Sequence, residues 1–156
     1  MTEASISIST KNGSSQTCDD IFISYSRRDL VFAKNLVEKL TNASLKVWFD
    51  QNNIPEAVNF RTEIERGIIN AHNFIFIISS DSIGSRYCRE EIEIALKYGK
   101  RIIPILCRMP NANEIKDSMH PVVQDLNWIY LKESEGALNV LCQSISSALN
   151  KHKAYV

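Results

Sequence analysis

The chain has 156 residues, the size of a single globular domain, and 44% of them are hydrophobic, which is enough for one core. Its 18 Lys and Arg residues balance 18 Asp and Glu residues, so no net positive field attracts nucleic acid or an anionic membrane surface. No apolar stretch approaches the roughly twenty residues of a membrane-spanning helix. We therefore expect a cytoplasmic protein that binds neither nucleic acid nor a membrane.

The cysteines and histidines give little support to a metal site. The cysteines are far apart and form no Cys-x-x-Cys pair, so we interpret them as reduced thiols, mostly in the core. They are Cys18, Cys88, Cys107 and Cys142. The histidines lack the spacing of a metal-binding helix and have no evident partner, so we expect surface or loop residues and no metal. They are His72, His120 and His152.

The first part of the chain predicts a leader followed by a strand and a helix. Residues 1–18 are rich in Ser, Thr, Asn and Gly and carry too few large apolar groups to offset the entropy of ordering. We expect a domain over residues 19–150 and a short tail over 151–156. Residues 21–25 form a β-branched and aromatic run that predicts a buried strand. A helical stripe follows, with Asp29 in the first turn: Ala33, Leu36, Val37 and Leu40.

The next elements alternate in the same way. Residues 45–49 predict a second strand, and a long polar loop follows over residues 50–59, from Asp50 to Asn59,. Phe60, Ile64 and Ile68 mark a second helix by their spacing,. Residues 74–78 are continuously apolar, which a central parallel strand buried on both faces requires.

The second half of the chain predicts two more strands. After a polar connection over residues 79–85, a helix is expected over residues 86–98 with Gly99 as its left-handed cap,. Residues 101–107 predict a fourth strand, irregular or at an edge because it contains Pro104. Residues 109–121 resemble a loop with one helical turn, and residues 126–131 predict a fifth strand. A last helix buries the following stripe: Leu138, Leu141, Cys142, Ile145 and Leu149.

This alternation predicts an α/β fold, a flavodoxin-like three-layer sandwich with a five-stranded, mostly parallel sheet and helices on both faces. In such sheets ligands bind outside the carboxyl ends of the strands. The loops after Tyr25, Phe49 and Ile78 are therefore the expected place for a site.

Three segments at those loops share an order and a spacing. They are residues 20–26, residues 47–50 with the loop that follows, and the set Ser79, Ser85, Tyr87, Cys88 and Glu91. Together they resemble the Toll/interleukin receptor (TIR) domain family over most of the chain, and the loop of residues 50–59 is similar to the family's BB loop. That loop lacks the glycine many relatives carry, and Tyr87 stands where Trp is most common.

The helix expected at residues 86–98 carries a carboxylate on an unexpected side. Its polar side holds Arg89, Glu90, Glu93 and Lys97. Glu91 falls instead in the apolar sector with Cys88 and Ile92,. A carboxylate in such surroundings must be partnered, lie at the edge of a cleft or take up a proton. The alternative is that Glu91 sits at the border of the stripe and reaches into solvent.

The resemblance implies an NAD+ glycohydrolase or cyclase with Glu91 as the catalytic residue. NAD+ is then a substrate, because the glycines form neither a dinucleotide fingerprint nor a P-loop,, and no cofactor is expected. An anion beside the ribose stabilises the oxocarbenium-like cation that departure of nicotinamide leaves. The product is ADP-ribose or a cyclic isomer, and the sequence does not decide between them.

The resemblance also assigns substrate contacts, each with a structural alternative. Tyr87 stacks by the nicotinamide or is a core aromatic, and Phe60 is a second aromatic of the site or a core contact. Tyr25 and Ser26 form a turn that contacts substrate. Ser85 is first of all a helix cap. Arg27 and Arg28 are diphosphate partners or solvated charges, and Cys88 is a buried thiol.

Two other functions compete with the enzymatic hypothesis. Many TIR domains act only as interaction modules that self-associate through the BB loop and signal in immunity or cell death. Retention of Glu91 favours the enzyme over that alternative. An unrelated flavodoxin-like binding protein or response regulator is disfavoured, since no acidic pocket or lysine stands at the strand ends in the expected arrangement.

Overall fold

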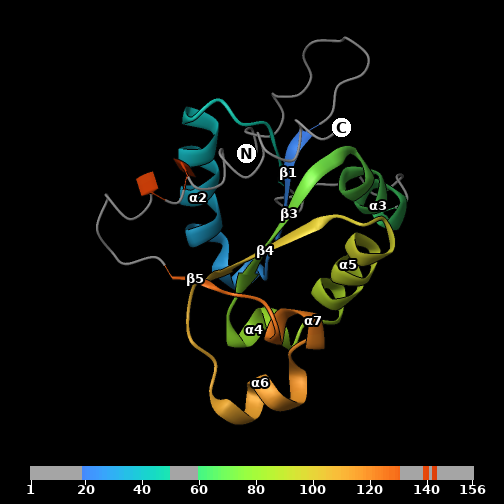
Figure 1. The fold of residues 1–156 in the computed structure, drawn as a ribbon, viewed down its shortest axis with the longest axis vertical. Coiled ribbons are helices and arrows are strands. Elements are labelled where there is room, and N and C mark those ends of the chain that lie inside the picture. The colour runs from blue at the N-terminus through green and yellow to red at the C-terminus, as the bar shows by residue number, and fades with distance from the viewer. Residues whose placement is uncertain (1–18, 50–59, 131–138, 141, 144–156) are drawn as a thin grey trace.

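The computed structural model describes residues 19–49, 60–130, 139–140 and 142–143. Its five strands form one parallel sheet in the order β2-β1-β3-β4-β5 (Figure 1). The strands are β1 (Asp19–Ser24), β2 (Val47–Trp48), β3 (Ala71–Ile78), β4 (Arg101–Leu106) and β5 (Ile129–Tyr130). The helices are η1 (Arg27–Asp29), α2 (Leu30–Asn42), α3 (Phe60–Asn70), α4 (Ser80–Ile83), α5 (Arg86–Lys97), α6 (Ala112–Ser118) and α7 (Pro121–Gln124). The predicted α/β class is confirmed.

Alternating side chains on β1 and β3 build a separate core on each face of the sheet. Ile21 and Ile23 of β1 pack with the buried stripe of α2. Phe22, between them in sequence, packs on the other face with Ile64 of α3 and Ile92 of α5. Because successive side chains of a strand point to opposite faces, one strand supplies both cores. This explains why residues 21–23 of β1 and 74–78 of β3 are apolar, whereas polar residues stand at the starts of both strands,.

The three long helices and the central strands lie where the sequence predicts them. Strand β3 is in the middle of the sheet, as expected. Helix α5 ends as predicted, because Gly99 adopts a φ of 68° that side chains disfavour,. Strands β2 and β5 are shorter than expected. Of the last helix, residues 139–140 and 142–143 are helical and Cys142 is buried on the α2 face.

Several predictions concern residues that lie outside the described part of the chain. These are the leader (1–18), the loop of residues 50–59, the tail (151–156) and the stripe positions Leu138, Leu141, Ile145 and Leu149. Within the described part, none of the helices combines the length and the apolar character that crossing a membrane requires.

Pro104 was expected to mark an irregular or an edge strand, and the edge position is wrong. Strand β4 is paired with β3 on one side and β5 on the other. Pro104 lies opposite Phe76 of β3, and pairing with β5 begins only at the next residue, Ile105. The proline is tolerated because residues 101–104 of β4 are not paired with β5. On that side a missing backbone N–H removes no hydrogen bond of the described sheet,.

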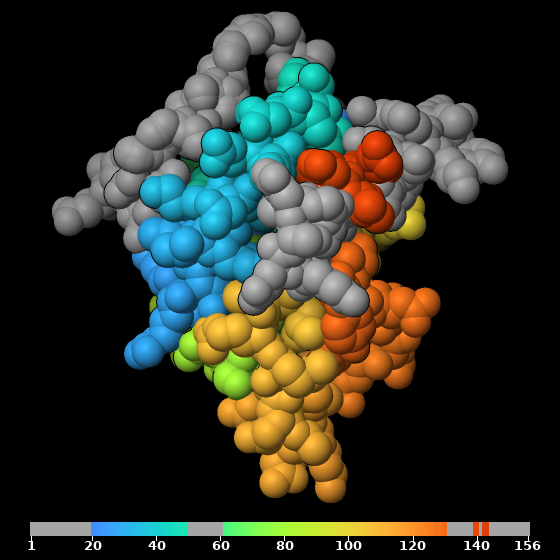
Figure 2. All heavy atoms as spheres, turned by 90° about the vertical axis from the view of Figure 1, so that its left-hand side faces the viewer, coloured from blue at the N-terminus to red at the C-terminus, as the bar shows by residue number. Residues whose placement is uncertain are grey.

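Three short helices replace segments that the sequence predicted as loops or connections. Helix α4 lies within residues 79–85, α6 lies within the segment 109–121, where one helical turn was expected, and α7 begins at the end of that segment. Side-chain caps start them: Ser79 and Ser82 form a capping box on α4, and Asn111 and Glu114 form one on α6,. These helices lie at the carboxyl end of the sheet (Figure 1), and α6 projects beyond the rest of the domain in the side view (Figure 2).

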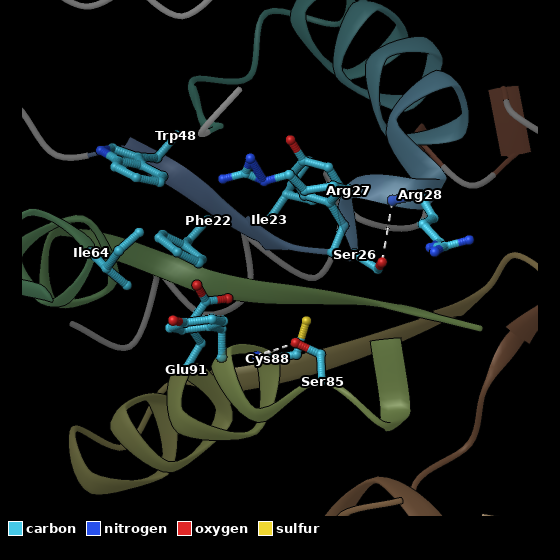
Figure 3. Close-up of a pocket in the computed structure, with 12 residues that line it drawn as sticks. Phe22, Ile23, Ser26, Arg27, Arg28, Trp48, Ile64, Ser85, Cys88 and Glu91 are labelled. Atoms are coloured by element: carbon cyan, nitrogen blue, oxygen red, sulfur yellow. Dashed lines mark hydrogen bonds between the residues drawn. The ribbon is translucent and has the colours of Figure 1, made fainter. Parts of the chain in front are cut away.

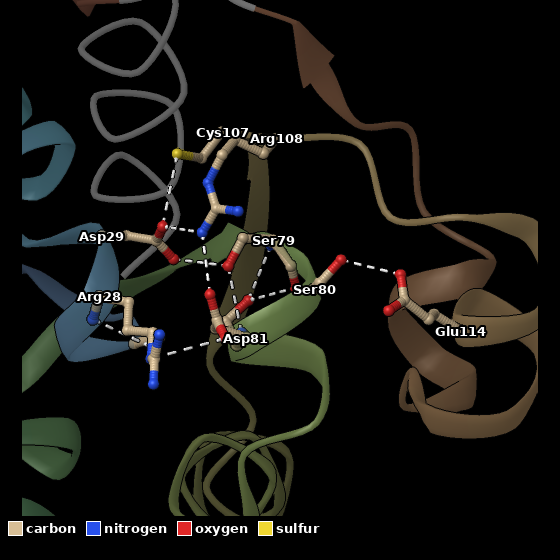
Figure 4. A network of polar contacts seen from close by, with 10 residues as sticks. Arg28, Asp29, Ser79, Ser80, Asp81, Cys107, Arg108 and Glu114 are labelled. Atoms are coloured by element: carbon tan, nitrogen blue, oxygen red, sulfur yellow. Dashed lines mark hydrogen bonds and ion pairs between the residues drawn. The ribbon is translucent and has the colours of Figure 1, made fainter.

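A buried carboxylate joins three connections at that end (Figure 4). The Asp29 side chain is 1% exposed. Its Oδ2 accepts a hydrogen bond from Ser79 Oγ at 2.5 Å, and its Oδ1 accepts one from Arg108 Nη2 at 2.6 Å. These residues follow β1, β3 and β4, so one ion pair and one hydrogen bond to the same carboxylate join three strand ends. Asp29 was expected only as a favourable charge at a helix start; it is the N-cap residue of α2 but makes no side-chain cap bond.

Close packing against an aromatic stack explains a glycine in α3. The Trp48 ring stacks on Phe22 with centroids 4.8 Å apart. Gly67 faces the same ring, and a Cβ built there would lie 2.8 Å from Trp48 Cε2. We predict that Gly67→Ala lowers the free energy of unfolding by about 1–2 kcal/mol, since overpacking outweighs the gain in helix propensity. Urea unfolding measures this. An increase in stability would contradict the packing.

The Asp29 ion pair gives a second stability prediction. Arg108→Ala leaves a buried carboxylate with fewer partners, so we expect a loss of about 1–3 kcal/mol. The matched control is Arg86→Ala, which removes an exposed i,i+4 pair with Glu90 and costs at most about 0.5 kcal/mol. Thermal unfolding of both variants compares them. Equal melting temperatures for the two variants would show that the Asp29 network adds no stability.

Candidate active site

A pocket of about 530 Å³ lies between the carboxyl end of β1 and the start of α5 (Figure 3). Ser26, Arg27 and Arg28 stand on its β1 side, and Ser85, Cys88 and Glu91 face them from α5. The lining residues are Phe22, Ile23, Tyr25, Ser26, Arg27, Arg28, Trp48, Ile64, Ser85, Tyr87, Cys88 and Glu91. The pocket thus occupies the edge of the sheet where a ligand site was expected.

Glu91 points from α5 into this pocket. It is half-buried, and its Oε1 accepts a hydrogen bond of 2.6 Å from the hydroxyl of Ser24, the last residue of β1. The alternative in which Glu91 reaches into bulk solvent does not match this position. The sequence predicted that Glu91, in the apolar sector of α5, would be partnered, lie at the edge of a cleft or take up a proton. The structure shows it partnered and at the edge of a cleft,.

The start of α5 fixes where Glu91 stands. Ser85 is the N-cap residue, and its Oγ accepts a hydrogen bond from the Cys88 N–H at 3.2 Å,. Cys88 is buried beneath the pocket. Burial, and then the nearby Glu91 carboxylate, raise the pKa of the Cys88 thiol to about 12. Cys88 is therefore a neutral packing residue at physiological pH, as predicted, and not a nucleophile.

The opposite wall comes from the turn after β1. Tyr25 is half-buried and stacks on Phe49 with ring centroids 5.1 Å apart. Ser26 caps η1, accepting a hydrogen bond from the Arg28 N–H at 3.2 Å. Arg27 and Arg28 are exposed, and Arg28 lies 3.9 Å from Asp81. The Arg27 guanidinium stands across the pocket from the Glu91 carboxylate, whereas that of Arg28 is turned toward Asp81 (Figures 3 and 4).

The structure describes the side chain of only one of the two other aromatic residues that were assigned to the site, Tyr87 and Phe60. Tyr87 lines the pocket and is 64% exposed, which contradicts the alternative of a core aromatic. Phe60 begins α3, and its side chain lies outside what the structure describes. The predicted residues brought together at the pocket are therefore Tyr25, Ser26, Ser85, Tyr87 and Glu91.

Sequence reasoning missed Ser24 and Trp48 as residues of the site. Trp48 was assigned only to a strand, yet its ring lines the pocket. Ser24 was read as part of an apolar strand. The sequence did contain the information, because Ser24 is two residues after Phe22 in the same strand. Its side chain therefore points to the same face of the sheet as Phe22, the face that α5 covers. The sequence also missed a partner for His120, whose Nε2 lies 2.6 Å from Glu93 Oε2.

The chemistry that this arrangement offers is stabilisation of positive charge. A carboxylate held against a partly enclosed, aromatic-flanked space attracts a cation more strongly there than in bulk water. The Arg27 guanidinium opposite suits an anionic part of the same ligand,. Among the described residues, no group of three or more His, Cys, Asp or Glu side chains is placed to hold a metal ion.

Curated relatives of the chain carry NAD-related names. A probable 2′ cyclic ADP-D-ribose synthase, TcpO of Methanobrevibacter olleyae, is 32% identical over 91 residues, covering 56% of this chain and 27% of the relative. The NAD(+) hydrolase TcpC of Escherichia coli strain CFT073 is 25% identical over 107 residues, covering 65% of this chain and 34% of the relative. The chain thus spans about a third or less of these proteins.

Solved structures show the same fold. The TIR domain of a Toll-related receptor from Hydra magnipapillata superposes with a TM-score of 0.69 at 21% identity, covering 85% of this chain and 98% of that domain. The family model described as TIR domain matches residues 21–142, which include both walls of the pocket. On this match, the chain belongs to the TIR domain family.

Proposed function

We propose that this domain is an NAD+ nucleosidase that cleaves the bond between nicotinamide and ribose, with Glu91 as the catalytic residue. The observation that carries the proposal is the Glu91 carboxylate, half-buried in the pocket and hydrogen-bonded to Ser24 at 2.6 Å. Names of relatives that refer to NAD hydrolysis and cyclic ADP-ribose synthesis support it. NAD+ is the substrate, and the reaction needs no resident cofactor.

The reaction requires little beyond a well-placed anion. The bond between ribose C1′ and the nicotinamide nitrogen breaks, and its electron pair leaves with the nicotinamide and neutralises the cationic ring. The ribose becomes an oxocarbenium-like cation, which Glu91 stabilises across the pocket. Water that adds at C1′ and releases a proton gives ADP-ribose. A nucleophile within the same molecule gives a cyclic isomer instead.

The remaining pocket residues receive substrate-binding roles in this proposal. Tyr87 stacks on the nicotinamide end, and its exposure of 64% leaves the ring face open to a ligand,. Tyr25 and Ser26 contact the substrate from the β1 side, while Ser85 adds a contact beside its capping role. Arg27 and Arg28 face the diphosphate. Phe60 completes the set from the start of α3.

Assembly and cellular context are part of the same proposal. We expect the domain to act in the cytoplasm and to associate with other TIR domains through residues 50–59, so that activity rises on clustering. Immune or cell-death signalling is the expected role. A domain that associates but leaves NAD+ intact would instead be a non-catalytic interaction module, and the experiments below distinguish the two.

The first prediction concerns Glu91. With concentrated or artificially clustered protein, Glu91→Gln and Glu91→Ala should lower the rate of NAD+ loss by about 100-fold or more, because the charge facing the ribose cation is removed. The neighbouring Glu90→Gln is the matched control. Glu90 pairs with Arg61 and Arg86 on the polar side of α5, so its variant should keep wild-type activity. Chromatography of nicotinamide and ADP-ribose gives the rates.

Two results would contradict this prediction in different ways. Equal NAD+ loss in wild type and both Glu91 variants would remove that residue from the mechanism. Intact NAD+ with clustered wild-type protein would favour the interaction module.

The second prediction concerns Tyr87. Loss of a stacking ring should raise KM, so Tyr87→Ala is expected to raise KM for NAD+ by about tenfold, and Tyr87→Phe should stay near wild type. The matched control is Tyr98→Ala on the same helix, where the side chain is 39% exposed and does not line the pocket. Steady-state kinetics over a range of NAD+ concentrations measures KM. Unchanged turnover and KM in Tyr87→Ala would eliminate the stacking role.

A further inference from the structure

A hydroxyl occupies a position of β1 where the surrounding face is apolar. Ser24 is 1% exposed and lies opposite Phe76 of β3. By strand alternation it points to the same face as Phe22, which is packed against α3 and α5,. Burying a hydroxyl costs free energy unless it is hydrogen-bonded. The Ser24 hydroxyl meets this requirement with Glu91 as its acceptor.

The hydrogen bond has the length of a charge-assisted contact. Ser24 Oγ donates to Glu91 Oε1 at 2.6 Å, within the range of O–H···O⁻ bonds. A serine hydroxyl has one proton to give, and here Glu91 receives it. Ser24 itself is held in register with Phe76 of β3, while β2 pairs with β1 only at Ile21 and Phe22. A flexible glutamate side chain is thus held by a donor on a paired strand of the sheet.

The Cys88 thiol also lies within hydrogen-bonding reach of Ser24, but it is the weaker acceptor,. Cys88 is buried below the pocket, and its thiol stays neutral because burial and the charge of Glu91 raise its pKa to about 12. A neutral thiol is a weak acceptor, whereas an ionised carboxylate is a strong one. The Ser24 proton therefore remains directed at Glu91.

From this geometry we propose that Ser24 is a positioning residue, which holds the Glu91 carboxylate in the orientation that faces the ribose. The inference rests on the proposed NAD+ cleavage and adds a residue that acts through Glu91. Displacement of a catalytic group by about 1 Å costs on the order of 100-fold in rate. Removal of the donor should therefore reduce turnover far more than substrate binding, to which Ser24 contributes no pocket surface.

The test compares Ser24→Ala, Ser24→Thr and Ser82→Ala with clustered wild type. We expect Ser24→Ala to lower kcat by about 10- to 100-fold with KM changed less than about threefold. Ser24→Thr keeps the hydroxyl and should recover most of kcat. Ser82 is a buried serine, 1% exposed, that bonds to Ser79 away from the pocket, so Ser82→Ala should keep wild-type kcat. Thermal melting of each variant separates a loss of turnover from a loss of folding.

The outcomes distinguish this inference from the proposed function. Wild-type kcat in Ser24→Ala, together with inactive Glu91→Gln, would overturn the positioning role and leave NAD+ cleavage standing. A loss of kcat in Ser24→Ala that simply follows a loss of folded protein, with no recovery in Ser24→Thr, would also overturn it. Inactive wild type would overturn the proposed function, and the positioning role with it.

Discussion

Burial of β1 and β3 on both faces is the constraint on which the rest of this domain depends. A strand covered on both faces carries mainly apolar side chains, and helices lie above and below the sheet to cover them. Phe22 and Ile23 are adjacent in sequence, yet they belong to separate cores. Parallel strands joined in this way end at one edge. The pocket with Glu91 lies at that edge.

A buried serine stands at or just beyond the carboxyl end of each of these two strands. Ser24 closes β1, Ser79 follows β3, and each gives its proton to a carboxylate from another element, Glu91 and Asp29 respectively. Both serines are at most 1% exposed. The two bonds differ in use: the Asp29 cluster, with Arg108, ties loops together, whereas the Ser24 bond reaches into the pocket. A buried serine hydroxyl at a strand end can thus have either of two roles. It stabilises the fold when its acceptor joins loops, as Asp29 does, and it contacts the pocket when its acceptor faces the pocket, as Glu91 does.

Periodicity predicted the parts of the fold that are stabilised by apolar burial. Residues such as Leu36 and Ile64 repeat at helical spacing, and residues 74–78 of β3 are all apolar, so α2, α3, α5 and the central strands followed from the sequence. Helices α4, α6 and α7 did not, because caps such as Asn111 with Glu114 start them and a short helix shows little periodicity,. The burial of Asp29 also escaped prediction, since its partner Arg108 is 79 residues away.

The site itself was partly predictable. The helical periodicity of α5 and its place after the central strand predict where Glu91 lies, but they do not predict the pocket in front of it. That space is lined by residues from separate segments, among them Phe22 of β1, Ile64 of α3 and Tyr87 of α5, so it depends on packing between parts of the chain that are far apart in sequence. Phe22 stacks on Trp48 and Phe74. Two residues later the same face carries Ser24, which is buried and donates a hydrogen bond to the Glu91 carboxylate in the pocket wall. A larger apolar side chain at position 24 would be compatible with the strand pattern but would remove this donor, which is why burial alone does not explain a serine there.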